Sequence, residues 1–185
     1  MDDTRIISLY WERDETAIKE TSSKYGRLCT YIANNILSCR EDSEECVNDT
    51  YLAVWNAIPT QRPNRFSVFV SRITRNLALK RYEYLSAAKR SPGAVTSLEE
   101  LGDCVSGTEQ IESEIEKRLI ESAINHFLWQ QGEEKRNVFI RRYWYFDSIA
   151  AISQSTGFSQ SKIKSMLYEM RQKLRKYLES EGIEV

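Results

Sequence analysis

The stretch FSQSKIKSMLYEMRQKLRKYL, residues 158–178, has the apolar periodicity of a long amphipathic helix. On a helical wheel, one arc collects the residues expected in a core, namely Ile163, Met166, Leu167, Met170, Leu174, Tyr177 and Leu178. The opposite arc is cationic and rich in hydrogen-bonding groups: Lys162, Lys164, Ser165, Tyr168, Gln172, Arg175 and Lys176. Such a helix buries one face and leaves the other to an anionic partner or to solvent.

A short helix and a turn are expected just before it, in DSIAAISQSTG, residues 147–157. We expect Asp147 to cap the short helix, Gly157 to adopt a left-handed conformation and Ser159 to cap the long helix. Two helices joined in this way form a helix-turn-helix, whose second helix enters the major groove of DNA. The local pattern leaves one alternative open, a helical hairpin whose basic face is merely solvated.

The charges of the chain are segregated, although the formal net charge is only −1. Residues 62–90 contain eight basic side chains and a single acid, whereas residues 97–116 contain seven acids and no base. A net charge near zero therefore does not argue against a polyanionic partner, because the cations are concentrated in two places.

The remaining sequence also shows the three-to-four residue spacing of helices, and no segment of convincing length alternates as a strand would. In the first half we expect helices over about 14–37, from Asp42 or Ser43 as cap to Pro59, and over about 66–85. We therefore predict an all-α protein of two small helical domains. The predicted boundaries are 1–90 and 111–185, with a flexible acidic linker at 91–110 and a short helical turn near residues 97–103.

Several classes of function are excluded by missing motifs. No phosphate-binding glycine loop, dinucleotide fingerprint or nucleophile elbow occurs, so we expect no enzyme and no cofactor. The four cysteines lack metal-ligand spacing and His126 is the only histidine, so we expect reduced thiols and no metal site. No apolar run is long enough for a membrane span, and the start MDDTRIISLYWERDE does not resemble a signal peptide. We expect a cytoplasmic location without membrane insertion.

Two blocks of the chain resemble bacterial sigma-70-family initiation factors. DSEECVNDTYLAVWNAI (42–58) and RFSVFVSRITRNLALKRYEYLSAAKR (65–90) resemble region 2, with the closest likeness to the small extracytoplasmic-function (ECF) group. The second half, from IESAINHF (120–127) to RKYLESEG (175–182), resembles region 4 of the same group. The resemblance implies an all-helical transcription initiation factor that binds core RNA polymerase and directs it to promoters.

The resemblance also implies where the partners bind. Glu45, Asn48 and Asp49 match the positions that dock on the clamp helices of the largest polymerase subunit, and region 4 is expected to bind the polymerase flap. The −10 element would be recognised and melted by Arg72, Arg75, Asn76, Lys80 and Arg81. Single-stranded DNA is held by cations along its backbone and by groups that accept extruded bases, which suits this set. We expect Phe69 to belong to the core and leave Phe66 open.

The −35 duplex would be recognised by the helix-turn-helix, through Ser159, Gln160, Lys162, Lys164, Ser165, Tyr168 and Arg171. Within this set we expect Lys162 and Arg171 to contact phosphates, and Lys164 and Ser165 to contact base edges. Glu169 departs from the family pattern, which often has an arginine at this position.

Factors of this kind are commonly held inactive by an anti-sigma protein, often membrane-anchored, so the resemblance implies such a partner. Two other classes stay open. A stand-alone helix-turn-helix regulator would explain the last helix, but not the acidic helix followed by a basic one in the first half. A helical adaptor that binds only proteins would show no dependence on DNA.

Overall fold

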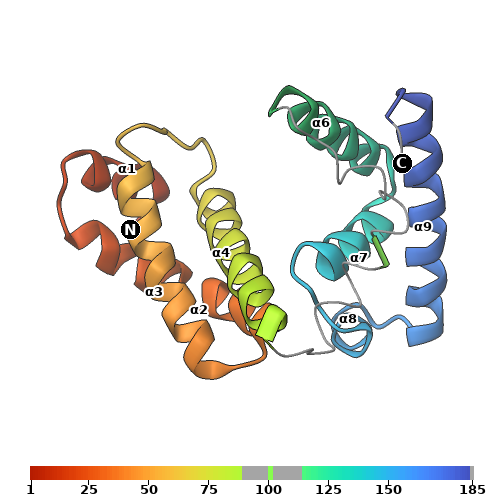
Figure 1. The fold of residues 1–185 in the computed structure, drawn as a ribbon, viewed down its shortest axis with the longest axis horizontal. Helices are drawn as coiled ribbons and strands as arrows, with labels where there is room; N and C mark the ends of the chain where they lie inside the picture. The colour runs from red at the N-terminus through yellow and green to blue at the C-terminus, as the bar shows by residue number, and fades with distance from the viewer. Residues whose placement is uncertain (89–99, 102–113, 184–185) are drawn as a thin grey trace. The chain divides into compact units, whose positions relative to one another are not determined.

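The computed structural model describes residues 1–88, 100–101 and 114–183. Within these residues the chain forms eight α-helices and no strand, which confirms the prediction of an all-α protein (Figure 1). The chain divides into two compact units, Met1–Ala94 and Val95–Val185. Most of the predicted linker lies outside the described residues; Glu100 and Leu101 belong to the described part and are helical.

The first unit contains α1 (Asp3–Trp11), α2 (Thr16–Leu37), α3 (Arg40–Ala57) and α4 (Phe66–Ala88). Helix α2 packs against each of the other three, and α3 also packs against α4. The largest side chains of its core are fully buried; they include Ile6, Tyr10, Ile32, Ile36, Ile58 and Phe66. Phe66, left open by the sequence, is therefore a core residue.

Helix α1 was missed by the sequence analysis. Its N-terminus is capped by the carboxylate of Asp2, which accepts a hydrogen bond from the Arg5 amide at 2.8 Å. The helix buries Ile6 and Tyr10 against the rest of the unit, and the Tyr10 hydroxyl lies 2.8 Å from the Thr21 hydroxyl. The cap and this tertiary contact together stabilise a helix of only nine residues.

The structure adds two details of the first unit, the start of α3 and the packing of Gly26 in α2. Helix α3 begins at Arg40, ahead of the expected caps Asp42 and Ser43, and its N-cap position is Cys39. Gly26, in the middle of α2, has a packing role, because a β-carbon there would lie 3.2 Å from the Tyr51 hydroxyl. A larger residue would require the Tyr51 side chain to shift slightly.

The second unit contains α6 (Glu114–Gln130), α7 (Glu133–Tyr143), α8 (Ile149–Thr156) and α9 (Gln160–Ser180). Helix α9 packs against α6, α7 and α8. Its buried arc matches the prediction closely, because Ile163, Leu167, Met170, Leu174 and Leu178 are all at most 1% exposed. The sequence pattern of α9 thus correctly divides the helix into a core face and a solvent face.

The turn between α8 and α9 has the expected glycine and serine. Gly157 adopts the left-handed conformation at φ 74°, and the Ser159 hydroxyl accepts a hydrogen bond from the Lys162 amide. The Ser153 hydroxyl donates to the Phe158 carbonyl at 2.6 Å, which ties α8 to the start of α9. The expectation for Asp147 was wrong: Ser148 caps α8, whereas Asp147 is buried and accepts a hydrogen bond from Arg141.

None of the described helices is long and apolar enough to cross a bilayer. Among the described residues, no cluster of histidine, cysteine, aspartate or glutamate has the proximity that a metal ion requires.

Candidate polymerase and nucleic-acid interfaces

The acidic residues predicted to bind polymerase lie together on α3. Glu45, Asn48 and Asp49 are all exposed, whereas Val47 and Val54 on the opposite side of the helix are buried. The sequence analysis missed Leu52, which is 59% exposed and lies one turn after Asn48 on the same face. The sequence does place Leu52 on the polar face of the helix. Periodicity alone, however, does not show whether an apolar residue is exposed or belongs to the core.

A hollow beside Asn48 extends this face toward α2. It is lined by Glu15, Ile18, Lys19, Ser22, Asn48, Tyr51, Leu52 and Trp55. Asn48 and Leu52 of α3 therefore border a partly apolar recess. We call Glu45, Asn48, Asp49 and Leu52 the α3 face.

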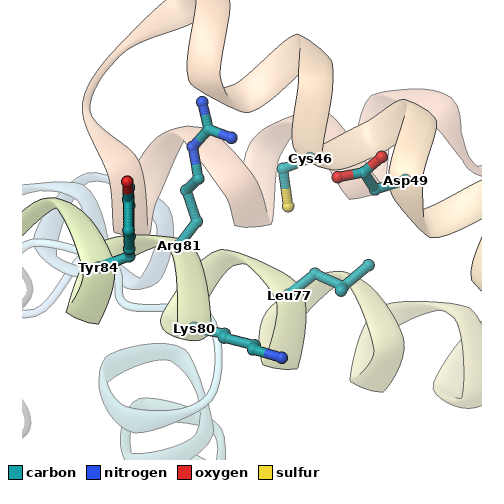
Figure 2. A pocket seen from close by; sticks show the side chains of 6 residues that line it. All are labelled: Cys46, Asp49, Leu77, Lys80, Arg81 and Tyr84. Carbon is teal, nitrogen blue, oxygen red and sulfur yellow. The ribbon is translucent and has the colours of Figure 1, made fainter.

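Arg81, predicted to contact DNA, is paired with acids of α3. Its Nη2 lies 2.6 Å from Asp42 Oδ1 and 2.7 Å from Glu45 Oε2. Figure 2 shows its side chain extending from α4 toward α3, whereas Lys80 lies on the other side of α4. The hydrogen bonds that Arg81 donates to Asp42 and to Glu45 raise the pKa of Arg81, and the hydrogen bond from Arg81 lowers the pKa of Asp42. The predicted DNA-binding and polymerase-binding residues are therefore joined by an ion pair.

Arg81 also borders a hollow of about 280 Å³ between α3 and α4, together with Cys46, Asp49, Leu77, Lys80 and Tyr84 (Figure 2). Burial raises the pKa of Cys46 to about 12, so its thiol stays protonated near neutral pH. A protonated, buried thiol is a poor nucleophile and a poor metal ligand. The hollow therefore offers a surface for contacts and not a reactive centre.

We expect Asp42→Asn to make the unfolding free energy of the first unit less dependent on pH in the acidic range. Folding lowers the pKa of Asp42 below its ordinary 3.8, so the pairing stabilises the folded state above pH 3.8 and is lost as the pH falls through the lowered value. The unfolding free energies of wild type and variant should therefore differ at neutral pH and converge below pH 3.8. Urea denaturation over this pH range measures the difference; a gap that stays constant down to pH 3 would show that the pairing does not contribute.

The residues predicted to contact the −10 element are divided by the structure. Arg72, Asn76 and Lys80 are exposed and follow one another at intervals of four, so they form a stripe along α4, which we call the α4 stripe. Arg75 is only partly exposed, and burial lowers its pKa. Arg75 and Arg81 thus differ from the α4 stripe in accessibility.

A second basic feature, missed as a site by the sequence analysis, lies at the start of α4. A hollow there is lined by Gln61, Arg62, Pro63, Asn64, Arg65, Val68, Phe69 and Arg72. Val68 is 50% exposed and Phe69 is partly buried, so the hollow combines an apolar side with three guanidinium groups. Its sequence signal was the basic run that begins at Arg62. Only the fold shows that this run gathers around one recess.

The predicted helix-turn-helix, α8 and α9 with the turn between them, presents most of its predicted DNA-binding residues to solvent. Those exposed on α9 and at its cap are Ser159, Gln160, Lys162, Lys164, Ser165 and Tyr168. The Lys162 ammonium lies 3.5 Å from the centre of the Phe158 ring, a cation–π contact. Glu169, the departure from the family pattern, pairs with Lys135 of α7 at 3.0 Å. Its charge is therefore partly compensated within the unit.

Arg171 differs from these residues, because its side chain is only 18% exposed. Its Nη1 donates to the Tyr143 hydroxyl at 2.7 Å and lies 3.6 Å from a carboxylate oxygen of Glu100. The structure therefore places this predicted phosphate contact at the edge of the exposed face of α9.

The described residues thus form an all-helical protein, with exposed acids on α3 and exposed bases on α4 in one unit, and with α8 and α9 joined by a short turn in the other. Residues 22–88, which run from within α2 to the end of α4, match the family model described as Sigma-70 region 2. A comparison with curated proteins gives no significant match.

The match shows that this segment is similar to sigma-70 region 2 and supports a sigma-70-family sigma factor. It supports a role in promoter-directed transcription initiation, with core RNA polymerase and promoter DNA as partners.

Proposed function

We propose that the chain is an ECF-group sigma factor that binds core RNA polymerase, recognises −10 and −35 elements and assists promoter melting. The observation that carries this proposal is that the α3 face and the α4 stripe both lie within residues 22–88, the segment that matches region 2. The helix-turn-helix of the second unit supports the −35 part of the proposal.

In this account, the α3 face docks on the clamp helices of the largest polymerase subunit. Asp49 and Glu45 attract a basic partner, and Leu52 supplies an apolar contact at the end of the face that borders the recess. An exposed apolar residue ringed by polar ones is typical of a protein interface. The flap of the polymerase is the proposed partner of the second unit.

Melting is assigned to the α4 stripe and to the hollow at the start of α4. Arg72 and Lys80 attract the phosphates of a displaced strand, and the Asn76 amide offers a donor and an acceptor to an extruded base edge. The hollow adds Arg62 and Arg65 next to Val68 and Phe69, a combination suited to a nucleotide with its apolar base face and its phosphate. Arg75 and Arg81 complete the proposed set.

The −35 element is assigned to α9 and its cap. The exposed candidates run from Ser159 to Tyr168, and Arg171 lies at the edge of this face. Lys164 and Ser165 are directed at base edges and Lys162 at a phosphate. These roles lead to different expectations for the two lysines.

We expect Lys164→Ala to change the preferred −35 sequence and Lys162→Ala to leave it unchanged. A lost base contact costs about 1–3 kcal/mol of discrimination at one position. A lost phosphate contact weakens all promoters alike and lowers the salt slope by roughly one counterion. Binding of holoenzyme to a library randomised at −35, at several salt concentrations, separates the two effects. Identical selected sequences for wild type and Lys164→Ala would remove the base-reading role.

The proposed function is tested by asking whether DNA binding requires polymerase. A sigma factor should comigrate with core enzyme and confer promoter binding on it. A stand-alone regulator should bind a duplex operator in the absence of polymerase, and an adaptor should show no DNA dependence in either condition. Either of the last two results would replace the proposal.

An anti-sigma partner and a cytoplasmic location are also proposed, both on the family resemblance. The anti-sigma protein, membrane-anchored in this proposal, would cover the polymerase-binding surface. Deleting a neighbouring membrane-protein gene should then raise transcription from the promoters of this factor; an unchanged level would argue against that partner. Cell fractionation tests the location, and recovery of the protein in the membrane fraction without such a partner would contradict it.

A further inference from the structure

The carboxylate of Glu100 is held by three side chains of the second unit. Arg142 approaches both of its oxygens, with Nη2 2.8 Å from Oε1 and Nε 3.3 Å from Oε2. The Tyr143 hydroxyl donates to Oε2 at 3.3 Å, and Arg171 Nη1 lies 3.6 Å from the same oxygen. This two-pronged contact of a guanidinium with a carboxylate is the geometry of strong charge-assisted hydrogen bonds.

The site that holds this carboxylate is built into the fold. The Arg142 side chain is 9% exposed, and its third nitrogen, Nη1, donates to the Asp147 carbonyl at 3.2 Å. Its orientation is therefore fixed from inside the unit, and its other two nitrogens point at the anion. Leu101, the next residue, packs against the hydrophobic core of the unit, so an apolar contact adjoins the ionic one. The carboxylate offsets part of the cost of burying the guanidinium charge.

Arg171 links this anion site to the exposed face of α9. It follows Lys164 by seven residues and Tyr168 by three, so the three side chains share one stripe of the helix. Lys164 and Tyr168 are exposed, whereas Arg171 turns to Glu100 and Tyr143 at the border of the core. The same guanidinium is thus in contact with Glu100 and beside the face proposed to bind DNA.

We propose that Arg142, Tyr143 and Arg171 form an anion-binding site that Glu100 occupies in the free chain, and that Glu100 competes with a DNA phosphate for Arg171. The docking of Glu100 stands on the contacts alone, whereas the competition rests on the proposed function. Glu100 neutralises one cation at the edge of α9, so the acidic segment weakens DNA binding by the second unit. A phosphate that reaches Arg171 must first displace this carboxylate.

The competition makes a distinct prediction for salt dependence. In the wild type, the phosphate exchanges with a carboxylate, so this contact releases little additional counterion. With Glu100→Gln the site loses its anion, and the same phosphate contact should add roughly one counterion to the salt slope of DNA binding. Glutamine keeps a carbonyl acceptor for Arg142, so the unit is expected to remain folded, which circular dichroism checks. Glu99→Gln, an equal change of charge at the neighbouring position, is the matched control.

The docking is tested first, without DNA, by amide hydrogen exchange of the full chain. Glu100→Gln should speed exchange in the peptide that contains residues 100–101, and Glu99→Gln should leave it at the wild-type rate. Equal exchange in wild type and Glu100→Gln would overturn the docking, whatever the protein does with DNA.

The competition is tested by holoenzyme binding to promoter DNA across a range of salt. Glu100→Gln should tighten binding and steepen the salt slope, Glu99→Gln should do neither, and the effect of Glu100→Gln should vanish when it is combined with Arg171→Ala. An equal response to Glu99→Gln, or an effect of Glu100→Gln that persists with Arg171→Ala, would overturn the competition. The docking is decided separately by the hydrogen-exchange result. If holoenzyme does not bind promoter DNA in any variant, the proposed function fails and the competition fails with it.

Discussion

Leu167→Asp is expected to unfold the second unit. Leu167 is 1% exposed and belongs to the core cluster that joins α9 to α6, α7 and α8. Truncating a buried leucine costs about 2–5 kcal/mol, and burying an unpaired carboxylate adds a penalty of similar size. A small domain is stable by only about 5–15 kcal/mol, so the sum removes most or all of its stability.

The first unit should survive this change, because its core is built from α1 to α4. Hydrogen exchange should show lost protection for α6 to α9 and retained protection for α2, and circular dichroism should show a partial loss of helix. Gln172→Asp introduces the same charge at an exposed position of α9 and should leave both signals unchanged. A Leu167→Asp variant that melts like the wild type would contradict the assignment of this residue to the core.

The second large effect is expected for polymerase binding: Asp49→Lys should abolish copurification with core enzyme. Asp49 is exposed on α3 and is part of the proposed contact with a basic surface. Reversing its charge places two cations against each other, and a like-charge contact of this kind costs several kcal/mol. A penalty of this size weakens binding by more than about a hundredfold.

The fold should not change with Asp49→Lys, because the side chain lies outside the core. Glu12→Lys is the matched control, an equal reversal at the exposed C-cap of α1 and thus on another element. Normal copurification by a folded Asp49→Lys variant, or equal loss in the control, would remove Asp49 from the interface.

The parts of the fold that sequence predicted well are those with local signals. Helix α9 was recognised from its apolar arc, Gly157 and the Ser159 cap, all of which depend on neighbours within a few positions. Helix α1 was missed because it is short and its stability depends on the packing of Tyr10 against α2. Asp147 was misassigned because its carboxylate pairs with Arg141, which leaves Ser148 as the cap.

The candidate sites show the same difference between local sequence signals and long-range contacts. Asn48, Asp49 and Asn76, which the sequence assigned to partner contacts, are all exposed in the structure. The pairing of Arg81 with Asp42 and that of Arg142 with Glu100 join residues 39 and 42 positions apart, which no local pattern indicates. Basic residues were therefore identified by type from the sequence, but their accessibility depended on long-range ion pairs.

Run-off transcription tests most directly whether this chain gives core polymerase access to promoters. Core enzyme is assayed on DNA from upstream of the chain's own gene, with no added factor, with wild type and with Asp49→Lys. We expect a transcript of defined length only with the wild type. Three results would contradict this role: the same transcript without the factor, an equal amount of transcript with Asp49→Lys, or no transcript with the wild type on any promoter selected from a random library.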